Sequence, residues 1–166
     1  MIDTVKIYYK SKLAIVRDSV IDDVFELART MRPADKAEIW KSNHRTPESA
    51  LVSGYTNSAI CMTIERKESP IAMFGAVPYA IMSRVASVWL LASPELNNVQ
   101  RTFIKYSRSF IDLMLSSYPI LENYVDVENK QSIRWLKWCS AEFGPAVIYG
   151  VEQQLFHYFR FRRNHV

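Results

Sequence analysis

The run ASVWLLA at residues 86–92 is followed by a helical pattern over residues 98–118 and by a second strand-like run at residues 124–127. The first run has no charged side chain, so we expect a central strand that is buried on both faces. Apolar and polar side chains along residues 98–118 recur on opposite helix faces. The apolar stripe is Val99, Phe103, Tyr106, Phe110 and Leu113, and the polar one is Arg101, Lys105, Arg108 and Asp112. This strand–helix–strand order predicts one parallel crossover.

Shorter elements flank this unit on both sides. Upstream, the patterns predict a strand at 13–16, a helix with Asp18 or Ser19 as its N-cap, short helices over 34–42 and after Thr46-Pro47, and a hairpin of 59–66 with 71–77. Residues 59–66 alternate as a half-buried strand does. Downstream, they predict a helix from Asn129 to about Ser140 and a closing hairpin of 146–149 with 155–161. The sequence therefore predicts a mixed, mostly antiparallel α/β sheet with helices on both faces.

Length and composition favour a single domain. The chain has 166 residues, of which 49% are hydrophobic and 13% aromatic, enough for one core. We assign residues 13–161 to this domain, residues 1–12 to an N-terminal extension and residues 162–166 to a basic C-terminal tail. The net charge of +4 is a mild excess, to which the last seven residues contribute Arg160, Arg162 and Arg163. This basic end is either a solvated terminus or a contact for phosphate or an acidic partner.

Several classes of protein are disfavoured. Cys61 and Cys139 lie in apolar segments without a second ligand at metal spacing, and the three histidines are scattered. We therefore expect buried, reduced thiols and no metal site, which fits a cytoplasmic origin. The charged N-terminus does not resemble a signal peptide, and no stretch approaches 18 apolar residues. Neither secretion through a signal peptide nor a membrane span is expected.

Several motifs carry a resemblance to a known fold and family. NYVDVEN at 123–129 with SIRWL at 132–136 resembles the C-terminal motif of the GCN5-related N-acetyltransferase (GNAT) fold. More narrowly, MRPAD at 31–35 followed by Glu38, MFGAVP at 73–78, WLL at 89–91 and SIRWLKW at 132–138 are similar to a family of short-tailed bacteriophage proteins that includes internal virion protein A. The resemblance covers about residues 13–159. It implies a GNAT-like fold, other phage virion or assembly proteins as partners, and a location in the virion and the host cytoplasm.

The resemblance also implies where a cofactor would bind. GNAT enzymes hold the pyrophosphate of acetyl-CoA on a glycine-rich turn before the long helix, where backbone N–H groups reach the phosphates. Here that stretch is SPELNNVQR at 93–101, which has no glycine and carries Glu95. Asn98, Arg101, Lys105 and Asn129 remain as cofactor-binding candidates. Arg101 and Lys105 either compensate for the missing glycines or form the solvated face of the helix.

The expected acid is missing as well. In the family motif a tyrosine follows the asparagine by seven residues, and counting from Asn129 reaches Leu136, which cannot donate a proton. Tyr149 and Tyr158 are substitutes or core aromatics. Glu65 and Glu128 are candidate bases or the solvated faces of strands. We therefore expect a GNAT-like protein that has lost catalysis, binds no cofactor and acts by association. The alternative is an acetyl-CoA-dependent N-acetyltransferase with an unconventional cofactor site.

Two surfaces are candidates for partner binding, because arginine and aromatic side chains concentrate interface energy. One is the helix that carries Arg134, Lys137 and Trp138, although a core position for its tryptophans is the competing interpretation. The other is the basic end at Arg160, Arg162 and Arg163. Nucleic-acid binding by this basic end and inhibition of a host protein remain as further hypotheses.

Overall fold

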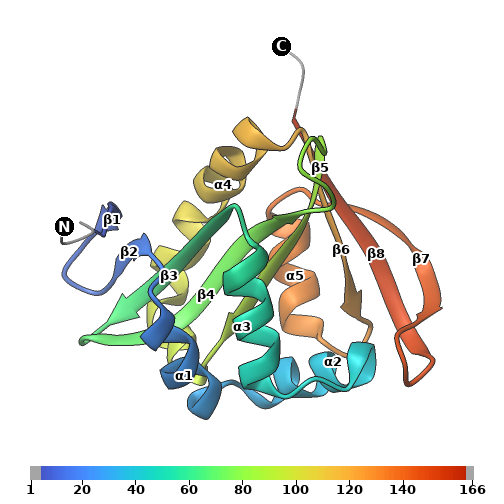
Figure 1. Ribbon diagram of the computed structural model, residues 1–166, viewed down its shortest axis with the longest axis horizontal. Helices are drawn as coiled ribbons and strands as arrows, with labels where there is room; N and C mark the ends of the chain where they lie inside the picture. Colours follow the sequence, from blue (N-terminus) through green and yellow to red (C-terminus); the bar gives the residue numbers. More distant parts are fainter. Residues whose placement is uncertain (1–4, 164–166) are drawn as a thin grey trace.

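The structure, a computed structural model, describes residues 5–163. Eight strands form one sheet in the order β1-β2-β3-β4-β5-β6-β8-β7, and only the β5–β6 pair is parallel (Figure 1). The predicted mixed, mostly antiparallel sheet with one crossover is confirmed.

The elements in chain order are β1 (Ile7–Lys10), β2 (Ile15–Asp18), α1 (Ile21–Thr30), α2 (Pro33–Asn43), α3 (Pro47–Asn57), β3 (Ile60–Arg66), β4 (Ser69–Pro78), β5 (Val85–Ala92), the 3-10 helix η1 (Pro94–Val99), α4 (Gln100–Ser117), β6 (Ile120–Asp126), α5 (Lys130–Trp138), β7 (Glu142–Tyr149) and β8 (Gln154–Arg162).

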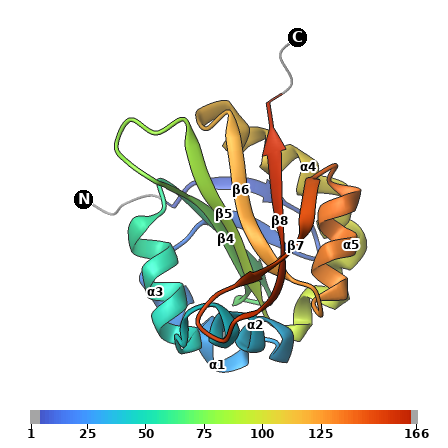
Figure 2. The same ribbon diagram turned by 90° about the vertical axis from the view of Figure 1, so that its right-hand side faces the viewer.

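Helices cover both faces of the sheet, as predicted. Helices α1, α2 and α3 lie on one face and α4 and α5 on the other (Figures 1 and 2). Each face has its own core. The smaller core, between α1–α3 and the sheet, is built from Val24, Leu27, Met31, Ile39, Leu51 and Met73. The larger one, on the α4–α5 side, includes Met62, Ile111, Leu121 and Phe159.

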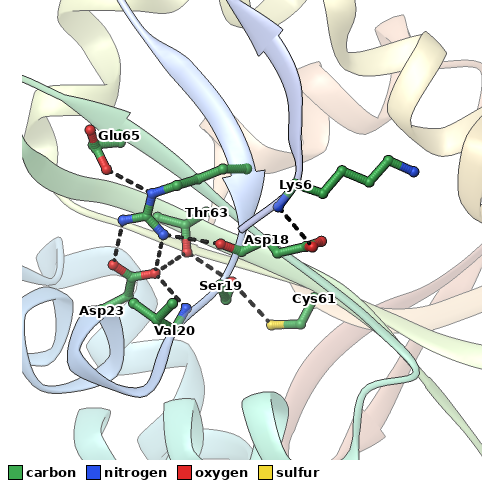
Figure 3. A network of polar contacts seen from close by, with 9 residues as sticks. Lys6, Asp18, Ser19, Val20, Asp23, Cys61, Thr63 and Glu65 are labelled. Carbon is green, nitrogen blue, oxygen red and sulfur yellow. Dashed lines mark hydrogen bonds and ion pairs between the residues drawn. The ribbon is translucent and has the colours of Figure 1, made fainter. Parts of the chain in front are cut away.

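Strand β3 corrects the expectation of a half-buried strand. Met62 and Ile64 face the larger core, but Thr63, on the opposite face, is also fully buried. The Thr63 hydroxyl donates a hydrogen bond of 2.7 Å to Asp23, which compensates for its burial (Figure 3). Because helix α1 covers this face, the polar side chains of the alternating pattern point into the protein.

Residues Ile7–Lys10 form an edge strand of the sheet. The sequence assigned residues 1–12 to an extension, yet β1 pairs antiparallel with β2. The ring of Tyr9 packs against Tyr106 of α4 at 4.3 Å. Strand β1 has only four residues (IYYK), too few for a periodic pattern, although Ile and Tyr are residue types that favour strands.

The buried face of helix α4 differs slightly from the predicted apolar stripe. The helix begins at Gln100, after η1, and buries Ser107, Ile111, Met114 and Leu115. Leu113, predicted for the apolar stripe, is 38% exposed. Strand β6 starts at Ile120, earlier than expected, so the helix and the strand are separated only by Tyr118 and Pro119.

Strands β5 and β6 separate toward their C-terminal ends. Their parallel pairing is limited to Val85–Ser87 with Ile120–Glu122. Beyond that point the side-chain amide of Asn123 donates a hydrogen bond of 2.8 Å to the carbonyl of Val88, in place of a backbone partner. This separation leaves β5 only half-buried near Trp89, Leu90 and Leu91, although burial on both faces was expected. The gap positions the candidate site.

Candidate functional site

A cavity of about 490 Å³ lies beside the separated ends of β5 and β6. Side chains from both strands, from α2 and α3 and from the β7–β8 hairpin line it. Its polar and aromatic lining includes Glu38, Trp89, Asn123, Tyr124, Ser132 and Tyr149. A concave site with a few convergent polar groups at a break in a sheet is where α/β proteins commonly bind ligands.

Glu38 of α2 is the acidic group of this cavity. Its Oε2 atom accepts hydrogen bonds of 3.1 Å from the Asp126 backbone N–H and from the side-chain amide of Asn129. Burial raises the pKa of Glu38 to about 7, although these two hydrogen bonds oppose the rise. A carboxyl group with this pKa exchanges its proton near neutral pH.

The charged neighbours of Glu38 are engaged in structural contacts. Asp126 is buried and forms an ion pair with Lys41 of α2. Asp35 accepts hydrogen bonds of 2.8 Å from Arg32 and from the Ala92 backbone N–H, at the end of β5. Burial raises the pKa of Asp35 also. These contacts hold α2 against both separated strands.

The β7–β8 hairpin closes one side of the cavity. The ring of Tyr149 stacks on Tyr124 with centroids 4.0 Å apart. At the hairpin turn, the Val151 and Glu152 N–H groups donate to the carbonyls of Ser42 and Lys41, at the C-terminal end of α2. Gly150, just before Val151, has φ +75°, and a Cβ there would lie 2.6 Å from the Lys41 carbonyl oxygen. Glycine is therefore required for the hairpin to approach α2 this closely.

The N-terminus of α4 differs from an open anion site. The Gln100 N–H donates to the carbonyl of Asn97, and the Leu96 N–H donates to Ser93, so η1 consumes these donors internally. Asn97 also accepts a hydrogen bond of 2.9 Å from Gln131 of α5. An exposed helix N-terminus attracts phosphate because its N–H groups are unpaired. Here, the Leu96 and Gln100 N–H groups already have hydrogen-bond partners within the chain.

The cofactor-binding candidates are dispersed. Asn98 donates to Glu95, which is also paired with Arg66 at 2.9 Å. Arg101 and Lys105 are exposed on α4. Asn129 caps α5 by accepting a hydrogen bond of 3.3 Å from the Ser132 N–H, in addition to its bond to Glu38.

The three catalytic candidates also occupy different places. Glu65 forms an ion pair of 2.7 Å with Arg17 and lies outside the cavity lining. Glu128 is exposed beside Lys130. Tyr149 lines the cavity, and burial raises the pKa of its phenol. Leu136, at the position of the expected acid, is 4% exposed and belongs to the larger core.

The partner-binding candidates divide into two groups. Arg134, Lys137 and Trp138 are exposed on α5, whereas Trp135 packs into the core. Arg160 and Arg162 both contact Glu142, at 2.7 and 3.6 Å. Arg163 donates to the carbonyl of Leu115 near the end of α4, so part of the basic end is tied to the domain. The rest of the predicted tail, residues 164–166, lies outside the described residues.

The sequence did not identify Glu38 as a residue of the candidate site. The residue was part of the motif after MRPAD, but its proximity to Asp126 and Asn129 arises from contacts across about ninety positions. Within residues 5–163, no group of three or more histidine, cysteine or acidic side chains is arranged to hold a metal ion. No helix in this part of the chain is long and apolar enough to cross a membrane.

The topology and the separation of β5 from β6 define the fold class as GNAT-like. Solved acetyltransferase structures share this fold. The ribosomal-protein-S5-alanine acetyltransferase from Vibrio fischeri matches with a TM-score of 0.67 at 12% identity, covering 93% of this chain and 95% of that one. Ard1 from Thermoplasma volcanium matches with a TM-score of 0.66 at 15% identity, covering 92% and 99%. A GNAT-family acetyltransferase from Bacillus anthracis gives 0.67 at 9% identity, covering 92% and 96%. At these identities the likeness shows the fold alone.

The match to a sequence family is more specific than the match to a fold class. The family model described as "Bacteriophage T7, probable scaffold protein Gp13" matches residues 61–146, just over half of the chain. The protein belongs to this phage family. No curated protein matches the chain. The expected GNAT-like fold and membership in a bacteriophage protein family are thus confirmed.

Proposed function

We propose that this protein is an internal virion or morphogenesis component of a phage, which keeps the GNAT architecture and acts by association instead of acyl transfer. Membership in a family described as a probable scaffold protein supports an assembly role. Its expected partners are other virion or assembly proteins, and its expected locations are the virion and the host cytoplasm. The proposed unit is one domain spanning residues 13–161, with β1 added at the sheet edge.

The observation that carries the proposal is the structure of the α4 N-terminus. Acetyl-CoA brings a pyrophosphate, which GNAT enzymes hold with free backbone N–H groups. In this chain η1 pairs the Leu96 and Gln100 N–H groups within the chain, and the Asn97–Gln131 hydrogen bond bridges η1 to α5. A pyrophosphate could use the Leu96 and Gln100 N–H groups only if these contacts broke. Leu136, buried in the core, adds no proton donor.

Calorimetric titration with acetyl-CoA tests the proposal directly. We expect no binding tighter than about 10 μM, which corresponds to about −7 kcal/mol. Tighter binding would contradict the loss of the cofactor site. A second arm measures incorporation of the protein into phage particles and the phage yield. A folded Glu38→Gln variant should be incorporated normally and should support normal yield.

One observation favours the alternative, an acetyl-CoA-dependent N-acetyltransferase. Glu38 lines the cavity, and its pKa of about 7 would suit a base that accepts a proton from an amine. Tyr149 is the cavity phenol that could serve as the acid. This function predicts acetyl transfer by the isolated protein and its loss in Glu38→Gln. If that variant enters particles normally yet abolishes phage growth, the alternative replaces the association proposal.

A further inference from the structure

Strand β7 is one of the two edges of the sheet, and within residues 5–163 its only strand neighbour is β8 (Figure 1). Its pairing with β8 is regular from Ala146 to Tyr149, whereas the register shifts between Phe143 and Ala146. Pro145, within that shift, has no N–H group, and the turn at Gly150 ends the strand on the other side. The part of this edge that can pair with a further strand is therefore residues 146–149.

Two residues of this segment direct their backbone N–H and C=O groups away from β8. The Leu155 carbonyl accepts a hydrogen bond of 3.2 Å from the Val127 N–H, so the backbone of Leu155 faces β6 and not β7. Ile148 lies directly opposite Leu155 in the antiparallel ladder, and its own N–H and C=O consequently point to the free edge. Ala146, two residues earlier, does the same because the ladder alternates. The edge thus presents the alternating donors and acceptors that another strand pairs with.

The side chains of this segment are apolar and exposed. Ile148 is 65% exposed, Leu155 beside it on β8 is 49% exposed, and Val147, on the other face of the sheet, is 39% exposed. Residues 143–151 contain no charged side chain. Edge strands that remain in water usually carry lysine or another charge that opposes pairing. Apart from the register shift before Ala146, which shortens it, this edge has no such protection, so we expect a strand to cover it.

We propose that the strand that covers this edge is β7 of a second copy of the chain, antiparallel to the first about a two-fold axis at Val147. In this register Ala146 of each copy lies opposite Ile148 of the other, and each such pair exchanges both of its hydrogen bonds. All the outward N–H and C=O groups of residues 146–149 are then paired. Moving the axis by one residue in either direction would place one of these residues opposite Gly144 or Gly150, outside the regular strand.

The side chains near this axis suit contact with their own copies. In a two-fold contact each residue at the axis meets its own kind, so a charged group there would be repelled. Here Val147 meets Val147 at a non-hydrogen-bonded position, where side chains are closest and apolar β-branched pairs stabilise a sheet. The nearest charges along the hairpin, Glu142 and Glu152, already contact Arg160 and His44 of their own chain. The pairing does not depend on the proposed function, since an enzyme with this fold could form it equally.

Sedimentation equilibrium of the full chain tests the self-association. We expect a monomer–dimer equilibrium with a dissociation constant below about 100 μM. Ile148→Lys places two like charges beside the axis and should raise this constant by roughly tenfold or more. The matched control is Ile81→Lys, the same substitution at a fully exposed position of the β4–β5 loop, which should stay within about twofold of wild type. Circular dichroism verifies that both variants are folded. A wild-type chain that remains monomeric at about 200 μM, or equal effects of the two substitutions, would overturn the proposal.

A cysteine at the axis tests the register. Across a non-hydrogen-bonded antiparallel pair the Cα atoms lie about 4.5 Å apart, a separation that a disulfide can span. Val147→Cys should therefore form a disulfide-linked dimer under mild oxidation and return to monomer on reduction. Val151→Cys, at a position 53% exposed but away from the axis, should cross-link no more than wild type, whose own Cys61 and Cys139 give the background. Equal cross-linking of the two variants, or a dimer that Val147→Cys does not cross-link, would exclude this pairing.

Discussion

The side-chain amide of Asn129 donates a hydrogen bond of 3.1 Å to Glu38, a residue 91 positions earlier in the chain. Asn129 uses its amide oxygen at the same time to cap α5. Glu38 accepts a second hydrogen bond from the Asp126 backbone, on the same carboxylate oxygen. These bonds join α2 to the β6–α5 junction. The shape of the cavity beside the split strands therefore depends on Glu38, whatever its chemical role.

The first prediction concerns the pH dependence of stability. The pKa of Glu38 rises from 4.5 to about 7 on folding, so the folded state retains a proton that the unfolded state releases. The free energy of unfolding should therefore fall as pH rises from about 4.5 through 7, and the full loss should be present above pH 7. This loss of unfolding free energy is about 3 kcal/mol at most. Denaturant titrations at pH 5 and pH 8 measure this loss.

Glu38→Gln is the matched variant for this measurement. An amide oxygen can occupy the Oε2 position and keep both hydrogen bonds, but glutamine does not titrate. We expect the stability of the variant relative to wild type to increase between pH 5 and pH 8 by up to about 3 kcal/mol. Other groups, including the buried Asp35, cancel in this comparison. An unchanged difference between the two pH values would contradict the raised pKa.

The second prediction concerns the hairpin turn. Gly150→Ala forces a side chain into positive φ and against the Lys41 carbonyl, so it should destabilise the protein by at least about 1 kcal/mol. Hydrogen exchange of the Val151 and Glu152 amides should accelerate, because both depend on docking to α2. Gly144→Ala is the control, since its Cβ would have ordinary contacts no closer than 3.5 Å. Equal effects of the two substitutions would refute this account.

The third prediction concerns the polar network between β2, α1 and β3 (Figure 3). Arg17 forms ion pairs of 2.8 Å with Asp23 and 2.7 Å with Glu65, and Asp23 is only 3% exposed. Arg17→Met leaves this buried carboxylate without its cation and should cost about 3 kcal/mol of stability. The cost should shrink by more than about 1 kcal/mol in an Asp23→Asn background, as a double-mutant cycle by urea unfolding would show. Additive costs would mean that the pair contributes no coupling.

The fourth prediction concerns Leu136. Because it is 4% exposed and packs into the larger core, Leu136→Ala should lower the free energy of unfolding by about 2–5 kcal/mol. Leu155→Ala, at a position 49% exposed, should cost less than about 1 kcal/mol. Thermal and urea unfolding compare the two variants directly. A small effect at Leu136 would argue that this position is not part of the packed core.

The sequence predicted most of the elements, because their signals are local. Thr46 caps α3 by accepting a hydrogen bond from the Ser49 N–H, as Thr46-Pro47 indicated. Asn129 caps α5 in the same way. The N-cap of the first helix, expected at Asp18 or Ser19, is instead Val20, and Asp23 accepts a hydrogen bond from the Val20 N–H. Asp23 is also buried and paired with Arg17, which are contacts that the local sequence does not reveal.

By itself the sequence determined the order of strands and helices, the parallel crossover and the absence of glycine before α4, since periodicity, caps and residue identity are properties of neighbours along the chain. Only the tertiary structure decided that β1 joins the sheet, that Thr63 is buried, and that Glu38 meets Asp126 and Asn129. Burial, and with it the pKa of Glu38, is set by side chains far apart in the sequence, and no local pattern records which of them come together.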